Sequence, residues 1–121
     1  MRSVRSFLYS TGEFIFPEDD SYGALSVFYG ILEGLTIRGE DFTLDMGSGC
    51  YDESGIEIFE RDIVEVPLWE AEEESRETCL VCYEDGYYNL VSEQGWEEGL
   101  SCSEEFKIIG HNHKLVEDVN T

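Results

Sequence analysis

The chain has 121 residues, which is enough for one domain with one modest core. Its 28 acidic and 7 basic residues give a formal charge of −21, which opposes binding to nucleic acid or anionic lipid and favours basic partners. A hydrophobic content of 41% excludes a chain that is disordered by composition, so we predict a single domain over residues 1–121.

One helix is predicted, near residues 21–33. Asp20 or Ser21 can cap its start, and Gly34 can follow its last turn. Apolar side chains recur at the spacing of one helix face, namely at Leu25, Phe28, Tyr29 and Leu32.

The rest of the chain predicts short strands joined by turns, with Asp85-Gly86 marking the clearest hairpin. We interpret residues 38–41 as a hairpin turn and residues 92–103 as an acidic loop. Many short strands with one helix are typical of a mainly β, α+β domain, either a small open β-barrel or an SH3-like or sandwich fold. The predicted strands are Phe7–Tyr9, Phe14–Phe16, Leu35–Ile37, Phe42–Leu44, Ile56–Ile58, Ile63–Val66, Thr78–Tyr83, Tyr87–Val91 and Phe106–Gly110.

Three stretches resemble the YopX-like proteins of phages and prophages, in the family's order, over roughly residues 46–115. Tyr83–Tyr88 is similar to the family's F-x-D-G-x-[FY] hairpin, and Phe106–Asn112 to its closing [IV]-x-[VI]-I-G-N. Tyr51–Val64 is similar to the signature D-x-x-G-x-x-I-[YF]-E-G-D-I-V. Eight positions of that signature match, at Asp52, Gly55, Ile58, Phe59, Glu60, Asp62, Ile63 and Val64.

The chain departs from the family pattern at two places. Arg61 stands where the family usually has glycine, and Lys114–Val116 replaces a frequent N-P-E-L. The resemblance implies a β-barrel-like domain encoded by a phage or prophage, with no enzymatic activity attached to it. It therefore supplies a setting, the bacterial host cell, and no catalytic residues.

The negative charge has two open interpretations, nucleic-acid mimicry or a solvated surface that serves only solubility. A folded chain of this size exposes about 6,600 Å², or about 310 Å² per net charge. Duplex DNA carries one charge per roughly 110 Å². Mimicry therefore requires that the carboxylates gather on one face.

Acidic residues are concentrated in the second half, where no basic residue occurs between Arg76 and Lys107. A tryptophan beside carboxylates is typical of a protein-binding hot spot, whereas Trp96 is interpreted as cover for the end of the barrel. We predict as partner-binding residues Trp69, Glu70, Glu72, Glu73, Glu74, Glu77, Glu97 and Glu98.

Cysteines and histidines suggest no site. Cys79 and Cys82 lie three apart in a predicted strand, so they point to opposite faces and do not resemble a zinc knuckle. His111 and His113 are interpreted as surface or edge residues. We predict no metal, no cofactor and no catalytic residue. The four cysteines are interpreted as reduced thiols, namely Cys50, Cys79, Cys82 and Cys102.

No stretch approaches the ~20 apolar residues of a membrane span, and the N-terminal residues lack the apolar core of a signal peptide. The hypothesis is a cytoplasmic accessory protein that binds and inhibits a basic host protein acting on nucleic acid, such as an anti-phage defence protein. It would bind neither nucleic acid nor membrane itself. The alternative is a structural or regulatory β-module without mimicry, and an enzyme ranks third.

Overall fold

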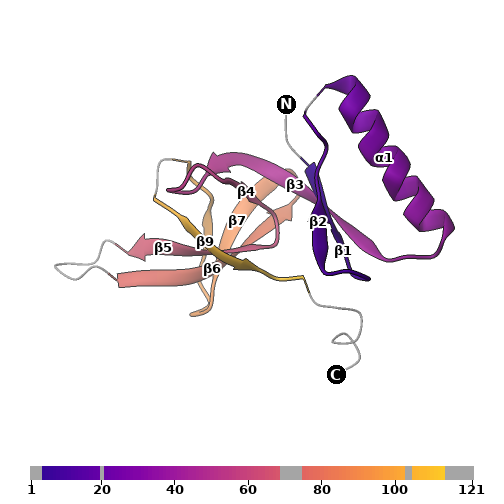
Figure 1. Cartoon of the computed structure of the whole chain (residues 1–121). Coiled ribbons are helices and arrows are strands. Elements are labelled where there is room, and N and C mark those ends of the chain that lie inside the picture. The colour runs from indigo at the N-terminus through magenta and orange to yellow at the C-terminus, as the bar shows by residue number, and fades with distance from the viewer. Residues whose placement is uncertain (1–3, 20, 69–74, 103–104, 114–121) are drawn as a thin grey trace. The chain divides into compact units, whose positions relative to one another are not determined.

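The structure, a computed structural model of the whole chain, describes residues 4–19, 21–68, 75–102 and 105–113 (Figure 1). As the sequence predicts, it is mainly β and of the α+β class. Its elements are β1 (Val4–Leu8), β2 (Glu13–Ile15), α1 (Tyr22–Ile37), β3 (Phe42–Tyr51), β4 (Glu57–Phe59), β5 (Asp62–Leu68), β6 (Ser75–Glu84), β7 (Tyr87–Ser92), β8 (Glu97–Gly99) and β9 (Lys107–His111).

The chain divides into two compact units, Met1–Met46 with His113–Thr121, and Gly47–Asn112. Strand β3 belongs to both. Its first half, Phe42–Met46, pairs with β1, and its second half, Gly47–Tyr51, pairs with β4.

In the first unit, β1 lies between β2 and β3, and Phe7 is paired with Phe14 on one side and Thr43 on the other. The predicted opening hairpin is confirmed. Its turn depends on Gly12, which has φ +72° and donates its N–H to the Leu8 carbonyl at 2.8 Å. Helix α1 packs apolar side chains against these strands, in a core formed by Val4, Phe28, Leu32 and Leu35.

Helix α1 begins as expected but ends later. The Ser21 hydroxyl caps its start by accepting the Ala24 N–H at 3.2 Å. The Asp19 carboxylate accepts hydrogen bonds from the Ser21 hydroxyl and from the Ser21 backbone N–H. Both lower the pKa of Asp19, the hydroxyl more than the backbone N–H. The predicted end at Gly34 is wrong, because the buried side chain of Leu35 continues the apolar face by one more turn.

The helix ends instead in a Schellman motif around Gly39, which has φ +73°. The N–H of Gly39 donates to the Thr36 carbonyl and that of Glu40 to the Leu35 carbonyl, both at 3.0 Å. Residues 35–37 are therefore helical, and the predicted strand Leu35–Ile37 with its hairpin at 38–41 is wrong.

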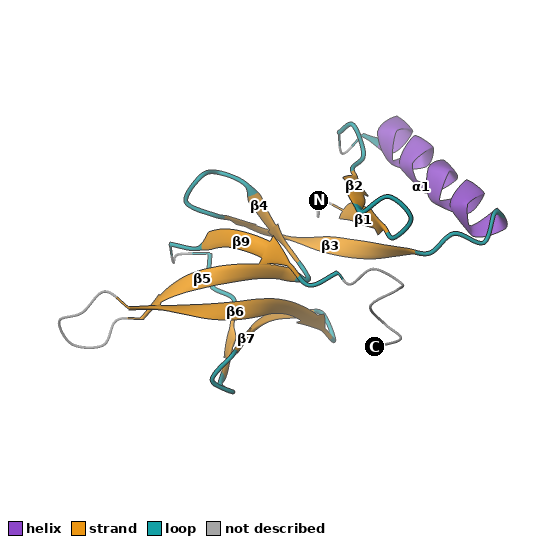
Figure 2. Ribbon diagram, turned by 60° about the horizontal axis from the view of Figure 1, so that its bottom comes forward, coloured by secondary structure: helices purple, strands orange, loops and turns teal. Residues whose placement is uncertain are grey.

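The second unit contains an antiparallel five-stranded sheet in the order β8-β7-β6-β5-β9, which curls into half of a barrel (Figure 2). The predicted Asp85-Gly86 hairpin joins β6 to β7, with positive φ at both turn residues. Trp96 and Tyr88 pack against the core, as predicted for Trp96. The core itself consists of Cys50, Ile58, Val64, Val66, Cys79, Val81, Leu90 and Phe106.

The predicted acidic loop at 92–103 contains a strand, β8, which pairs with β7. A tight turn at Gly95, with φ +98°, allows the Ser92 N–H to reach the Trp96 carbonyl at 2.9 Å. The sequence of β8, Glu-Glu-Gly, has no alternation of apolar and polar residues, so this strand gave no sequence signal.

The segment that resembles the YopX-like signature has a structural reason for most of its matched positions. The Asp52 carboxylate accepts the N–H groups of Ser54 and Ile56 at 2.9 and 2.8 Å, and Gly55 supplies a φ of +82°. The Asp62 carboxylate accepts the Phe59 N–H at 2.8 Å. Three further matched residues are buried in the second unit, Ile58, Phe59 and Val64.

Arg61 lies in the left-handed region with φ 71°, at the position where the family usually has glycine. Its backbone is held there from both sides, since its N–H donates to the Val81 carbonyl at 2.8 Å and its carbonyl accepts the Asn112 N–H at 2.7 Å. A side chain in this region is strained by about 1 kcal/mol or more.

We expect Arg61→Gly to raise the free energy of unfolding of the second unit by about 0.5–1 kcal/mol, because glycine adopts this φ without strain. Arg61→Ala is the matched control, since it removes the same side chain and retains the strain. Both tryptophans, Trp69 and Trp96, belong to this unit, so urea unfolding followed by tryptophan fluorescence measures the effect. An equal gain in both variants would contradict the explanation.

The first unit contains a fully buried carboxylate, Asp45. Its Oδ2 accepts hydrogen bonds from Arg5 Nε at 2.9 Å and from His113 Nε2 at 2.7 Å. The Arg5 guanidinium also lies 4.2 Å from the centroid of the Phe14 ring, and His113 packs against Phe7 and Phe14. His113 is thus buried, and its interpretation as a surface or edge residue is wrong, whereas His111 on β9 is exposed as expected.

The Asp45 network should make the first unit sensitive to acid. Burial opposes ionisation of Asp45, but hydrogen bonds from His113 and Arg5 and their charges outweigh it and lower its pKa. Because the folded pKa lies below the ordinary value of about 3.9, this stabilisation is present above pH ~4 and is lost as the pH falls further.

We expect Asp45→Asn to destabilise the first unit by about 3 kcal/mol at neutral pH, because it leaves the buried Arg5 without its counter-charge. The difference from the unchanged protein should shrink below pH ~4. Urea unfolding followed by circular dichroism at 222 nm, which reports on α1, measures this, with exposed Asp41→Asn as the control. A difference that stays constant from pH 7 to pH 2 would exclude the assignment.

Candidate protein-binding surface

Of the predicted partner-binding residues, Trp69, Glu70, Glu72, Glu73 and Glu74 lie outside the described residues. The other three are on strands of the second unit.

Glu77 on β6 is half-buried, and its carboxylate accepts the Ser92 hydroxyl at 2.7 Å. It therefore ties β6 to β7 within the sheet. Glu97 and Glu98 are exposed on β8, the outermost strand beside β7, where a partner has access to them.

Exposed carboxylates gather along the β7–β8 side of this sheet. We call them the acidic edge, and they lie at the β6–β7 turn, at the β7–β8 turn and on β8. The acidic edge consists of Glu84, Asp85, Glu93, Glu97 and Glu98. Sequence reasoning noted all five as acidic but selected only Glu97 and Glu98 as binding residues, because the pairing of β7 with β8 was not predicted.

The acidic edge extends along β7 from Asp85 to Glu93, roughly 25 Å at the rise of an antiparallel strand. Five charges over that length correspond to about one per 5 Å, compared with one per 3.4 Å along a single DNA strand. Because Glu97 and Glu98 are neighbours on a strand and point to opposite faces of the sheet, either face alone carries fewer of these charges than the edge as a whole.

Besides burial, the negative charge of the acidic edge raises the pKa of a nearby thiol, that of Cys82. Burial raises the pKa of Cys82, and the carboxylates of Glu84, Glu97 and Glu60 raise it further, while Arg61 lowers it. Glu84 and Glu97 thus come close to the same side chain from two different strands.

The arginines of the described chain are engaged elsewhere. Arg76 lies 3.8 Å from both Glu53 and Glu65, and Arg61 lies 3.6 Å from Glu60. The sequence of the unit 47–112 holds 18 acidic and 3 basic residues, which gives it a formal charge of −15 out of the total of −21. None of the five carboxylates of the acidic edge forms an ion pair among the described residues, so their charge is available to a partner.

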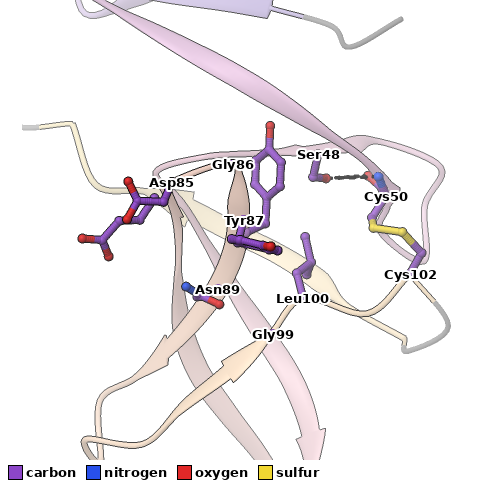
Figure 3. A pocket seen from close by; sticks show the side chains of 11 residues that line it. Ser48, Cys50, Asp85, Gly86, Tyr87, Asn89, Gly99, Leu100 and Cys102 are labelled. Carbon is purple, nitrogen blue, oxygen red and sulfur yellow. Dashed lines mark hydrogen bonds between the residues drawn. A yellow bond between two sulfur atoms is a disulfide. The ribbon is translucent and has the colours of Figure 1, made fainter.

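A pocket of about 660 Å³ lies beside the acidic edge, at the place where the chain leaves β8. Figure 3 shows Asp85 at one end of this pocket, the Cys50–Cys102 disulfide at the other, and Tyr87 between them. Its lining is formed by Ser48, Cys50, Glu84, Asp85, Gly86, Tyr87, Tyr88, Asn89, Gly99, Leu100 and Cys102.

The adjacent tyrosines differ in exposure, as expected for neighbours on a strand. Tyr87 is 72% exposed. Tyr88 is half-buried and packs against the core, and its hydroxyl donates to the Gly47 carbonyl at 2.7 Å.

Cys50 and Cys102 form a disulfide with a Cα–Cα distance of 4.9 Å, so the interpretation of all four cysteines as reduced thiols is wrong for this pair. The two residues are 52 positions apart in the sequence. Only the fold, which brings the end of β3 beside the segment before β9, makes them neighbours.

Cys79 and Cys82, on β6, are not part of a disulfide. Cys79 is buried in the core opposite Ser92, and Cys82 is half-buried opposite Asn89. Both lie on one strand, three residues apart, as predicted, so their side chains point to opposite faces of the sheet. Within the described residues, no three side chains of His, Cys, Asp or Glu form a group that could hold a metal ion.

The helix described in the structure is not long and apolar enough to cross a membrane. No protein-family model matches the chain, and a search of curated proteins gives no significant match.

The disulfide gives a direct chemical prediction. Alkylation of the denatured protein without reductant should modify two thiols, Cys79 and Cys82, and four after reduction. Closing a loop of this length stabilises the folded state by about 2–4 kcal/mol, so reduction should lower the stability of the second unit by that amount.

The double variant Cys50→Ala/Cys102→Ala is the control. It should unfold at the same urea concentration as the reduced protein and should not respond to reductant. Four reactive thiols before reduction would contradict the disulfide, as would a midpoint that reductant does not change.

Proposed function

We propose that the chain is an acidic accessory protein of a phage or prophage that binds a basic host protein and blocks its nucleic-acid site. The observation that carries this proposal is the acidic edge, five exposed carboxylates at two turns and on the outermost strand of one sheet, without ion pairs among the described residues. The host protein would be one that handles nucleic acid, such as a defence protein. We propose no catalytic step.

The phage setting is supported by the resemblance to the YopX-like proteins. The similar portion, roughly residues 46–115, is nearly coextensive with the compact unit Gly47–Asn112. Arg61 occupies a left-handed conformation at the position where the family usually has glycine, so the local backbone is the one that a glycine there would favour.

Binding through the acidic edge would proceed by long-range attraction followed by pairing of carboxylates with lysine and arginine. Such attraction speeds association at low salt and weakens as the ionic strength rises. Since nucleic acid would bind the same basic groups, it should compete with the protein for its partner.

The alternative is a β-module without mimicry, and the position of β8 favours it. Charged residues on an outer strand prevent pairing with strands of other molecules, and Glu97 and Glu98 lie on such a strand. On this hypothesis the carboxylates keep the protein monomeric, and a partner would bind elsewhere and independently of salt.

We propose the cytoplasm of the bacterial host as the location. Disulfides persist in oxidising compartments and are rare in the cytosol. This location therefore requires that the second unit keep its fold when Cys50 and Cys102 are reduced, which the double alanine variant tests.

The test of the function is capture of partners from a bacterial lysate on immobilised protein, at low and high salt, with and without added duplex DNA. Recovery at low salt of a nucleic-acid-binding protein that DNA displaces would support the proposal. Recovery of the same partner at high salt, unaffected by DNA, would exclude mimicry and leave the β-module.

With a partner in hand, neutralising four residues of the acidic edge (Glu84→Gln, Asp85→Asn, Glu97→Gln and Glu98→Gln) should weaken binding about 10- to 100-fold, if each pair contributes roughly 0.5 kcal/mol. The loss should fall mainly on the association rate. The matched control neutralises four exposed carboxylates of the first unit, Glu13, Glu18, Glu33 and Asp41. Equal losses in the two variants would mean that only total charge matters.

A further inference from the structure

The pocket beside the acidic edge has the composition of a site for a cation. Its lining residues include two exposed carboxylates, Glu84 and Asp85, and no lysine, arginine or histidine. Tyr87 belongs to the same lining and exposes 72% of its surface, an unusual amount for a large aromatic side chain on a strand. Carboxylates and an aromatic ring are both attractive to positive charge.

Much of the pocket wall is fixed by internal hydrogen bonds. The Tyr88 hydroxyl donates to the Gly47 carbonyl, and the Ser48 hydroxyl donates to the Ile58 carbonyl and accepts the Cys50 N–H. The disulfide joins Cys50 to Cys102 within the wall. A pocket of this construction does not need to be organised by its ligand, which lowers the entropic cost of binding.

One polar group of the lining is left for a ligand. The Asn89 carboxamide is half-buried, and the structure gives it no hydrogen-bond partner among the described residues. It can offer one acceptor and two donors. Leu100 and the disulfide supply apolar surface in another part of the lining.

We propose that this pocket receives an arginine side chain of a basic polypeptide partner. The proposal rests on the function proposed above and names the pocket as the place where one side chain of the basic partner is held. A guanidinium group is planar, so it can stack on the Tyr87 ring and pair with the carboxylate of Asp85 or Glu84 in the two-bond geometry that lysine cannot form.

The size of the pocket agrees with such an occupant. A volume of about 660 Å³ falls within the roughly 300–1,000 Å³ of typical ligand sites. This exceeds one side chain, so the pocket can hold an arginine together with the residues on either side of it. The acidic edge attracts basic partners in general, and the pocket would select those that present an arginine in an exposed segment.

The test uses two peptides of equal charge, four repeats of Gly-Arg and four repeats of Gly-Lys, titrated into the isotope-labelled full chain and followed by NMR. We expect the arginine peptide to bind about fivefold to thirtyfold more tightly. Its shift changes should concentrate on amides of the pocket, including those of Tyr87, Asn89 and Leu100.

Two variants assign the preference to the ring. Tyr87→Ala should remove most of the arginine advantage, whereas Tyr87→Phe should retain it because the aromatic face remains. Asp85→Asn, which keeps a residue suited to the positive φ of the turn, should weaken both peptides and the arginine peptide more. The amide spectrum of each variant confirms that the fold is intact.

Equal affinities for the two peptides, or an arginine preference unchanged in Tyr87→Ala, would overturn the proposal. That result is separable from failure of the proposed function. If a basic partner is captured and depends on the acidic edge, but Tyr87→Ala binds it with unchanged affinity, the function stands without the pocket. If the pocket prefers arginine but DNA displaces no partner, mimicry fails and the pocket remains a recognition site for arginine.

Discussion

Burying a carboxylate costs several kcal/mol unless hydrogen-bond donors replace its water, and this constraint shapes the whole acidic chain. Among the residues that the structure describes, three aspartates are buried, and each accepts hydrogen bonds from the protein. Asp45 is held by Arg5 and His113, whereas Asp52 and Asp62 are held by backbone N–H groups of tight turns. The signature that resembles the YopX-like family thus includes two aspartates whose roles are structural.

The remaining charge has to stay at the surface, and the fold distributes it unevenly. The sheet of the second unit buries alternate apolar residues of β5, β6 and β7 on one side, and its exposed carboxylates at the acidic edge lie at turns and on the outermost strand. Mutual repulsion among them lowers stability. The disulfide offsets part of that cost, and a bound basic partner would remove it, so the features that favour binding are also those that oppose folding.

Sequence patterns predicted the elements whose signal is local. The turns at Gly12 and at Asp85-Gly86, the cap at Ser21 and the split between Tyr87 and Tyr88 all follow from residue type and spacing. The end of α1 was missed because Leu35-Thr36-Ile37 has strand-like composition and becomes helical through burial of Leu35. Strand β8 was missed although it is local, because Glu-Glu-Gly carries no alternation of apolar and polar residues. Features that depend on long-range contact could not be predicted, since the partners lie far apart in the chain, as with Cys50 beside Cys102 and His113 beside Asp45.

The disulfide also makes the second unit a covalent ring. Every residue between Cys50 and Cys102 is linked to the rest of the protein from both directions, including the acidic stretch from Glu70 to Glu74 and the hairpin of β6 and β7. A protease that cuts once inside this ring releases no fragment, because both new ends remain attached through the cystine. The same closure would make a nick visible on a denaturing gel only after reduction.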